Sequence, residues 1–379
     1  GLLTMTAGNA IGFRADHTLE VHSLFHERYA SFLVESEHPL AIEEAVQLGW
    51  TDSAEAFQIG DKTLPLKDLT ELWRSPLENI YRTKADSPHA ALQTFRYSDG
   101  PRILPGPGRQ NHQKPLAIIP AFPGTNSEYD SARSIREAGG EAEIIVFRNL
   151  TQEAVDESLH ALAGAIRRAQ ILFIPGGFSA GDEPDGSGKF IATVLRSPIV
   201  GEAVMDLINR RDGLILGICN GFQALIKTGL VPFGEIRNPE PDAPTLTCNE
   251  IGRHVSCYVT TRIASNLSPW LSQCALDDRH IIPVSHGEGK FYASETQIRD
   301  LAARGQIATQ YADSEGHPSM LVEHNPNGSL FAIEGITSPC GRVLGKMGHT
   351  ERSGTNIARN IPGQKHQPLF SSGVHYFSD

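Results

Sequence analysis

One cysteine stands where a strand-to-helix turn would present a nucleophile. An apolar run at 214–218 is typical of a buried strand, and apolar side chains at 221–228 have helical spacing. Cys219 lies between them with a glycine two residues away on each side, which is the cysteine counterpart of the G-x-S-x-G nucleophile elbow. A helix N-terminus favours a thiolate, and the backbone N–H of Asn220 would face a developing oxyanion. The pattern predicts a nucleophile; a buried structural thiol between two glycines is the alternative.

A histidine and a carboxylate two residues apart supply a possible base for this cysteine. His349 and Glu351 follow the strand-like run 342–347. In an extended segment, residues i and i+2 lie on one side, so Glu351 can accept a hydrogen bond from the imidazole. A cysteine nucleophile needs a base, and the base needs an acceptor that orients it. We therefore expect His349 to be the base and Glu351 its partner; a surface histidine beside a surface glutamate is the alternative.

A glycine-rich loop, PGGFSAGD at 175–182, follows another apolar strand-like run at 171–174. Loops at the carboxyl ends of parallel strands are where α/β proteins build their sites. Such a loop can donate a second backbone N–H to an oxyanion, although glycines also occur in ordinary βα turns. No Gly-Lys-Ser/Thr follows, so the loop does not have the pattern of a phosphate loop.

Four further residues are weaker candidates for a cleft or an interdomain contact. His286 and Glu288 lie in SHGEG at 285–289, and Asn249 and Arg253 lie in TCNEIGRH at 247–254. His286 and Glu288 could lie near a cleft, but as a catalytic pair they lack a nearby nucleophile. Polar residues such as Asn249 and Arg253 more often satisfy loop backbone than bind a ligand. The other cysteines have no comparable turn and are expected to be spectators: Cys248, Cys257, Cys274 and Cys340.

The elements that must position these residues alternate between strands and helices from residue 116 onward. Strands are predicted at 116–119, 144–147, 171–174 and 213–218, and helices at about 126–139, 152–169 and 190–211. This alternation predicts an α/β fold with a mostly parallel sheet, flanking helices and right-handed crossovers. Asn-Pro-Asn-Gly at 325–328, between apolar segments at 320–323 and 330–334, predicts a hairpin and hence an antiparallel extension.

The chain before residue 114 has a different character. A strand is expected at 31–35, a helix over 39–49, and a second helix over 69–81 that Pro76 kinks or splits. The segment 96–113 is rich in Gly and Pro without apolar periodicity, which is typical of a linker. We therefore predict a small α+β segment at 1–95, a linker at 96–113 and the α/β domain at 114–379.

Composition excludes several classes of protein. The 379 residues carry 33 Lys and Arg against 44 Asp and Glu, a net charge of −11, so nucleic acid is not an expected partner. No apolar run approaches the roughly 20 residues that span a bilayer, and no basic region precedes the first apolar residues, so neither a membrane nor secretion is expected. Five cysteines without a CxxC pair predict reduced thiols in the cytoplasm, with no disulfide and no metal cluster.

These motifs together resemble those of the triad, or class I, glutamine amidotransferases, which have a flavodoxin-like fold. More narrowly, the chain from residue 114 is similar to the glutaminase domain at the C-terminal end of large phosphoribosylformylglycinamidine synthases. The matching segments follow in order: PAFPGTNSEYD at 120–130, PGGFSAGD at 175–182, GICNGFQ at 217–223, SHGEGKF at 285–291, NPNGS at 325–329 and GHTER at 348–352.

The resemblance implies a role for each matching residue. Cys219 would attack the side-chain amide of L-glutamine to form a thioester, with His349 as base and then acid, oriented by Glu351. The oxyanion and glutamine-binding set would be Gly176, Gly177, Phe178, Asn220 and Gln223, with Gly177 and Asn220 as oxyanion donors. The chain departs from some members in having Ser127 where they have Cys, and Thr350 where Pro is common.

The resemblance also bears on residues 1–95, which look like the tail of the aminoimidazole ribonucleotide synthetase-like lobe that precedes the glutaminase. In the family that lobe binds ATP, magnesium and formylglycinamide ribonucleotide and receives the ammonia. Most of it is missing from the 379 residues, so the chain is expected to be a C-terminal fragment without a cofactor of its own, working with synthetase domains. A non-catalytic docking module and another Cys-elbow amidotransferase or hydrolase are the alternatives.

Overall fold

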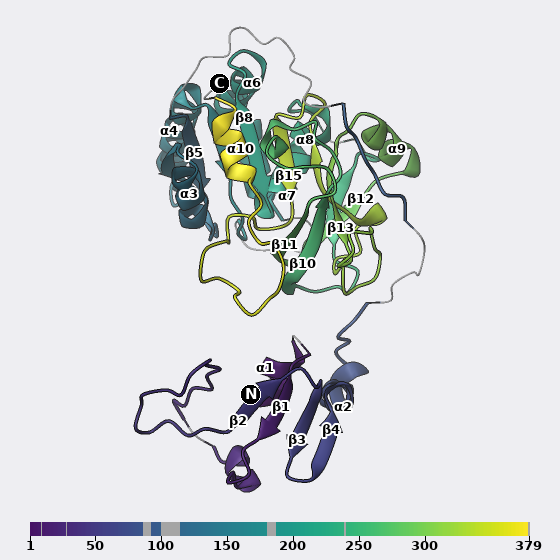
Figure 1. Ribbon diagram of the computed structural model, residues 1–379. Helices are drawn as coiled ribbons and strands as arrows, with labels where there is room; N and C mark the ends of the chain where they lie inside the picture. Colours follow the sequence, from purple (N-terminus) through teal and green to yellow (C-terminus); the bar gives the residue numbers. More distant parts are fainter. Residues whose placement is uncertain are drawn as a thin grey trace. The chain divides into compact units, whose positions relative to one another are not determined.

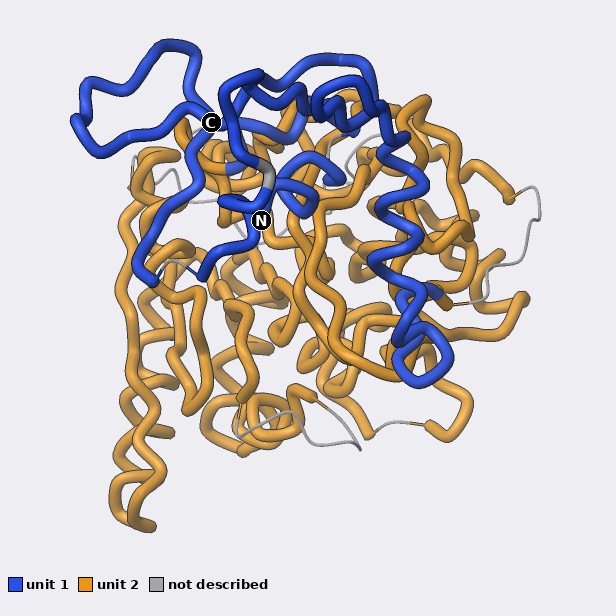
Figure 2. Tube along the Cα trace, turned by 90° about the horizontal axis from the view of Figure 1, so that it is seen from below, with its two compact units in different colours: residues 1–84, 358–362 blue, residues 85–357, 363–379 orange. Residues whose placement is uncertain are grey.

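The structure is a computed structural model that describes residues 1–8, 10–27, 29–85, 92–99, 114–179, 187–238 and 240–377. The chain forms two compact units, one of residues 1–84 with 358–362 and one of residues 85–357 with 363–379 (Figure 2). The first unit thus ends at Lys84, whereas the sequence places the end of the first domain at residue 95. Most of the predicted linker, residues 100–113, lies outside the described residues.

The first unit is a small α+β body with a four-stranded sheet in the order β2-β1-β3-β4. Strands β1 and β3 are parallel, and the other two pairs are antiparallel. Its core consists of Phe13, Phe57 and Leu66. Its elements are α1 (Leu2–Ala7), β1 (Gly12–Ala15), η1 (Val21–Phe25), β2 (Gly49–Asp52), β3 (Ala56–Ile59), β4 (Lys62–Pro65) and α2 (Leu66–Glu78).

Two local predictions in this unit are wrong. Residues 31–35 and 39–48 form neither strand nor helix, because their apolar side chains find no buried face: Phe32 and Val46 are largely exposed. The second predicted helix exists as α2 and continues through Pro76 to Glu78. Proline cannot donate to the carbonyl of Leu72, and the hydroxyl of Ser75 donates to that carbonyl at 3.3 Å instead.

The second unit is built on a nine-stranded sheet in the order β11-β10-β13-β14-β15-β8-β7-β5-β6 (Figure 1). The five strands from β15 to β6 are parallel, and the pairs from β11 to β15 are antiparallel. A separate two-stranded sheet pairs β9 with β12. The prediction of an α/β fold with a parallel sheet and an antiparallel extension is confirmed. The strands are β5 (Leu116–Ala121), β6 (Glu141–Val146), β7 (Ile171–Ile174), β8 (Leu214–Ile218), β9 (Thr245–Cys248), β10 (Val255–Ile263), β11 (Arg279–His286), β12 (Glu288–Tyr292), β13 (Ile307–Ala312), β14 (Ile333–Thr337) and β15 (Val343–Lys346).

Helices cover both faces of the parallel strands. Helices α3 and α10 contact each other, and Phe370 of α10 packs against Phe173 of β7. Helices α4, α5, α6 and α7 form a second contiguous layer. The predicted helix at 190–211 is split in two at Ser197-Pro198, since proline lacks the N–H that a continuous helix would need. The helices are α3 (Glu128–Glu137), α4 (Gln152–Arg168), α5 (Lys189–Arg196), α6 (Pro198–Asn209), α7 (Asn220–Thr228), α8 (Leu230–Phe233), α9 (Glu295–Ala303) and α10 (Leu369–His375), with short 3₁₀ helices η2 (Pro269–Leu271) and η3 (Leu330–Ala332).

The predicted hairpin around residues 325–328 does not form. Residues 320–323 are not a strand, and β14 pairs with β13 and β15 instead. Asn325 and Asn327 are buried, and their side-chain oxygens accept hydrogen bonds from the N–H of Ser329. These side-chain bonds close the turn locally, so it needs no strand partner. The antiparallel extension therefore consists of other strands than those expected.

Candidate active site

Cys219 is held in a strained turn between β8 and α7. Its backbone is at φ 52° and ψ −105°, a conformation that few side-chain-bearing residues adopt. Neither flanking glycine leaves room for a side chain. A Cβ on Gly217 would lie 2.7 Å from the carbonyl carbon of Gly221, and a Cβ on Gly221 would lie 2.1 Å from the carbonyl oxygen of Ile174. The N–H of Cys219 donates to the carbonyl of Lys346 at 2.8 Å, which extends the pairing of β8 with β15. The predicted elbow is present.

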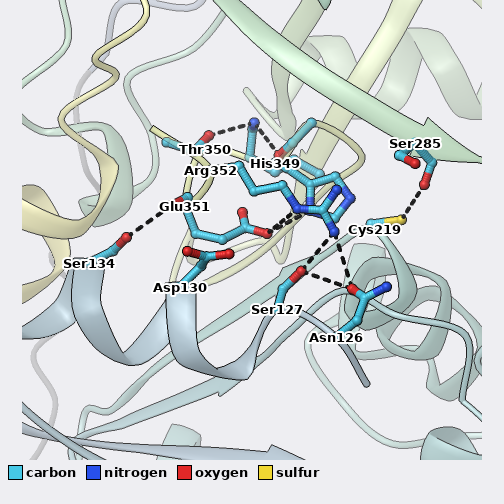
Figure 3. A network of polar contacts seen from close by, with 12 residues as sticks. Asn126, Ser127, Asp130, Ser134, Cys219, Ser285, His349, Thr350, Glu351 and Arg352 are labelled. Atoms are coloured by element: carbon cyan, nitrogen blue, oxygen red, sulfur yellow. Dashed lines mark hydrogen bonds and ion pairs between the residues drawn. The ribbon is translucent and has the colours of Figure 1, made fainter. Parts of the chain in front are cut away.

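His349 and Glu351 lie on the turn that follows β15 and are joined by a short hydrogen bond (Figure 3). Nδ1 of His349 is 2.6 Å from Oε1 of Glu351, and both side chains are almost fully buried. The backbone carbonyl of Glu351 accepts from Arg133 at 3.0 Å and from the hydroxyl of Ser134 at 3.4 Å, both on α3. Helix α3 therefore fixes the turn that carries the pair.

The electrostatics of this pair favour a charged imidazole. Burial lowers the pKa of His349, but Glu351 and the nearby sulfur of Cys219 outweigh it and raise the pKa to about 9. Burial likewise raises the pKa of Glu351, but His349 outweighs it, and the pKa lies below its usual value. Nε2 of His349 is buried and makes no hydrogen bond among the described residues. The free nitrogen can exchange a proton with Cys219, and an imidazolium beside a thiolate leaves the sulfur nucleophilic.

The glycine loop after β7 packs directly on the imidazole. A Cβ on Gly176 would lie 2.5 Å from Cε1 of His349, so only glycine fits beneath the ring. Gly177 pairs with Thr125 across a short bridge, and its N–H makes no hydrogen bond within the described part of the chain. The ring of Phe178 lies 5.8 Å from that of His254, tilted by 40°, and Nε2 of His254 lies 3.0 Å from the hydroxyl of Ser285. Residues 180–182 of the motif lie outside the described residues.

Asn220 and Gln223 form a buried link between this loop and α7. Oδ1 of Asn220 accepts from the N–H of Ser179 at 3.2 Å, and its Nδ2 donates to Oε1 of Gln223 at 2.9 Å. Gln223 in turn donates to the backbone carbonyl of Glu288. The backbone N–H of Asn220 is the first of helix α7 and has no partner within the helix. That N–H and the one on Gly177 are the groups predicted to bind an oxyanion.

The weaker candidates lie close to the elbow, but His286 and Glu288 do not form a pair with each other. Nδ1 of His286 is 3.1 Å from Oδ1 of Asn249, whereas Glu288 accepts from Lys227 at 3.0 Å and from the N–H of Ser187 at 2.7 Å. Burial, with smaller contributions from neighbouring histidines, lowers the pKa of His286 to about 3. Asn249 also donates to the backbone carbonyl of Arg253 at 3.0 Å. His286 directly follows Ser285, whose backbone carbonyl is 3.6 Å from Sγ of Cys219.

Sequence reasoning missed two groups around the turn that carries His349 and Glu351. Arg352 donates to Asn126 at 3.2 Å and to Ser127 at 3.0 Å, which connects the turn to the start of α3 (Figure 3). Lys346 and Glu334 form a buried ion pair beneath the same turn. The only signal for this pair in the sequence is a charged residue inside each of two otherwise apolar strand segments.

The family to which this α/β domain belongs is shown by comparison with known proteins. Residues 114–377 match the model of the CobB/CobQ-like glutamine amidotransferase domain, and the chain belongs to this family. It is similar to the phosphoribosylformylglycinamidine synthase subunit PurQ of Chlorobium chlorochromatii, with 33% identity over 251 residues covering 65% of this chain and 92% of that protein. For PurQ of Treponema denticola the values are 32% over 288 residues, 69% and 99%. The solved structure of PurLQS from Thermotoga maritima aligns with a TM-score of 0.49 and 24% identity, over 69% of this chain and 99% of that one.

Within the described residues, no helix is long and apolar enough to cross a membrane. No group of three or more His, Cys, Asp or Glu side chains in those ranges is placed to hold a metal ion.

Proposed function

We propose that this chain hydrolyses L-glutamine to glutamate and ammonia through a thioester on Cys219. The observation that carries the proposal is the strained elbow cysteine beside a buried histidine whose other nitrogen is bound by a buried carboxylate at 2.6 Å. A nucleophile, a base and an orienting acceptor in this order are the parts that amide hydrolysis through a covalent intermediate needs. The glutamine amidotransferase family of the domain supports the choice of substrate.

The reaction proceeds in two halves. The Cys219 thiolate attacks the side-chain carbonyl carbon of glutamine, and the oxyanion accepts hydrogen bonds from the N–H groups of Gly177 and Asn220. When the C–N bond breaks, the imidazolium of His349 gives its Nε2 proton to the departing nitrogen, and ammonia leaves. The neutral imidazole then takes a proton from water, which attacks the thioester, and the resulting tetrahedral species releases glutamate and the sulfur.

The other site residues hold these groups in place. Gly176 lets the loop approach the imidazole ring, and Phe178 on the same loop packs against His254. The side-chain amide of Gln223 is bound on both sides by protein groups, so we assign it to positioning Asn220 as well as to the glutamine pocket.

We further propose that the ammonia serves phosphoribosylformylglycinamidine synthase, in the ATP-dependent amidation of formylglycinamide ribonucleotide during purine biosynthesis in the cytoplasm. The similarity to PurQ, which is named as a subunit of that synthase, supports this role. Residues 1–95 are proposed to be the tail of a synthetase lobe, which would make the chain a C-terminal part of a larger synthase. ATP and magnesium are assigned to the synthetase domains, and no step of glutamine hydrolysis is routed through them.

Glutamate release from glutamine by the purified chain tests the proposed activity. Cys219→Ser should abolish turnover, while Cys257→Ser should retain it, because burial raises the pKa of the Cys257 thiol to about 11 and leaves it unreactive. Mass spectrometry on the same samples should detect a glutamyl adduct that disappears only with Cys219→Ser. If the intact chain neither turns over nor forms an adduct at high glutamine, the glutaminase proposal fails and a docking role replaces it.

A further inference from the structure

A fully buried ion pair lies directly beneath the turn that carries His349. Lys346, the last residue of β15, is 1% exposed, and Glu334 on β14 is 1% exposed. Nζ of Lys346 is 3.4 Å from Oε1 of Glu334 and donates to the carbonyl of Gly348 and to Oγ1 of Thr350, each at 2.9 Å. Two hydrogen bonds and one ion pair thus surround the ammonium group, as burial of the charge requires.

Glu334 binds the same turn from its other side. Its Oε1 accepts from the backbone N–H of Gly348 at 2.6 Å, and its Oε2 accepts from the hydroxyl of Thr309. The ion pair therefore satisfies both backbone polar groups of Gly348. The hydroxyl of Thr350, which accepts from Lys346, in turn donates a hydrogen bond to Oε1 of Gln367 at 2.8 Å. The residues immediately before and after His349 are both bound to this pair.

Lys346 also contacts the nucleophile's turn through its backbone. Its carbonyl accepts the N–H of Cys219 at 2.8 Å, while its side chain holds the two neighbours of His349. One residue therefore connects the cysteine and the histidine by hydrogen bonds on both sides. A displacement of about 1 Å between reacting groups can cost about 100-fold in rate, so such a connection matters for catalysis.

Stability alone does not account for a charged pair at this depth. Replacing a buried ion pair by apolar side chains of similar volume is often neutral or stabilising, whereas removing one partner strands a buried charge. We propose that Lys346 and Glu334 are positioning residues that hold His349 against Cys219, with Thr350 as their contact on the far side of the histidine. This inference rests on the proposed glutaminase function, because the reaction it serves is thioester formation at Cys219.

The decisive comparison separates stability from positioning. The double variant Lys346→Met/Glu334→Leu replaces the pair by apolar side chains. It should lower the Tm less than Lys346→Met alone, because no charge is left buried without its counter-charge, although the N–H of Gly348 loses its acceptor. Its kcat for glutamate release should nevertheless fall about 10- to 100-fold with little change in KM, because the turn has lost its anchors. Lys346→Met alone should lower the Tm as well, since Glu334 is then buried without its counter-charge. A double variant with the parent's kcat would overturn the proposal.

Thr350 offers a matched pair that leaves both charges in place. Thr350→Val keeps the side-chain shape but removes the acceptor for Lys346, and Thr350→Ser keeps the hydroxyl. We expect Thr350→Val to lower kcat several-fold and Thr350→Ser to keep the kcat of the parent, while both variants keep the KM of the parent. Equal kcat in the two variants would contradict a positioning role for the hydroxyl.

A readout that does not need turnover keeps this inference distinct from the proposed function. The rate at which iodoacetamide alkylates Cys219 at pH 7, followed by peptide mass spectrometry, depends on the thiolate that His349 stabilises. It should fall about tenfold in the double variant. A parent chain that releases no glutamate from glutamine would count against the proposed function. An unchanged alkylation rate in the double variant would refute the positioning role.

Discussion

Two buried histidines stand beside Cys219, and their environments have opposite effects. His349 after β15 and His286 at the end of β11 are 1% and 2% exposed, and each has an Nε2 without a hydrogen-bond partner among the described residues. Each ring also lies against a glycine, Gly176 for His349 and Gly289 for His286. Yet the pKa of His349 is raised to about 9 and that of His286 is lowered to about 3.

The difference follows from the acceptor at Nδ1. His349 faces the carboxylate of Glu351 at 2.6 Å, while His286 faces the amide oxygen of Asn249 at 3.1 Å. A neutral amide oxygen cannot offset the burial of a positive charge, whereas a carboxylate can. Burial by itself therefore yields a neutral histidine, and His349 owes its raised pKa to the buried carboxylate of Glu351 together with the nearby sulfur of Cys219.

Replacing that carboxylate should make His349 resemble His286. Glu351→Gln is expected to lower the pKa of His349 and to reduce kcat for glutamine hydrolysis by about 1,000-fold or more, as when a catalytic triad loses its acid. Steady-state glutamate release and an NMR titration of the imidazole measure the two effects. Glu157→Gln, at an exposed side chain on helix α4, is the control. A Glu351→Gln variant with parental kcat would refute the assigned role.

The glycine beneath His349 provides the next test. A Cβ at Gly176 must push the ring away by its contact with Cε1, so Gly176→Ala should lower kcat about 10- to 100-fold. Gly164→Ala on α4 meets no atom within 4 Å and should leave activity unchanged. Equal activity of the two variants would mean that the ring has freedom to move.

The two histidines should also change stability with pH in opposite directions. His286 has a folded pKa below its unfolded value, so its contribution is present above about pH 6.5 and is lost as the pH falls toward 3. His349 has a raised pKa, so its contribution is present below about pH 6.5 and is lost as the pH rises through about 9. His286→Gln should remove about 2 kcal/mol of the difference in unfolding free energy between pH 8 and pH 5, measured with urea. A pH dependence identical to the parent's would contradict the buried, neutral state of His286.

The reverse exchange should give the smallest effect on activity. Asn249→Asp supplies His286 with a carboxylate and should raise its pKa, seen by NMR, while kcat falls less than about tenfold because His286 is not the base. A loss as large as that of Glu351→Gln would make His286 a participant in the chemistry.

The parts of the site that are local in the chain were predictable, and the parts that join distant strands were not. The elbow at Cys219 follows from glycines at fixed spacing, and the pairing of His349 with Glu351 follows from their separation by one residue. Lys346 and Glu334 meet only because β14 and β15 pair, a tertiary fact that no local pattern carries. The Asn-Pro-Asn-Gly turn at 325–328 predicts a hairpin, but in the structure the side chains of Asn325 and Asn327 close the turn without a strand partner.

The same distinction explains the first 84 residues. Apolar side chains at 31–35 match a strand by composition, but Phe32 is 90% exposed and has no sheet to join. Helix α2 was found because its apolar periodicity is long, although its bounds shifted by three residues at each end. Apolar periodicity thus identifies elements that have a buried face, and it fails at 31–35, where Phe32 does not join the small core of this unit.

A short stretch outside the family match has a practical consequence for protein engineering. Phe95 donates to Gln310 at 3.0 Å and accepts from the buried Arg262 at 2.9 Å, and the N–H of Tyr97 donates to Ala264 at 2.9 Å. A recombinant domain trimmed to begin at residue 114 would strip this stretch and leave the Arg262 guanidinium short of an acceptor. An expressed amidotransferase domain should therefore start before Leu92. A chain cleaved between residues 97 and 114 should fold only when both pieces are present together.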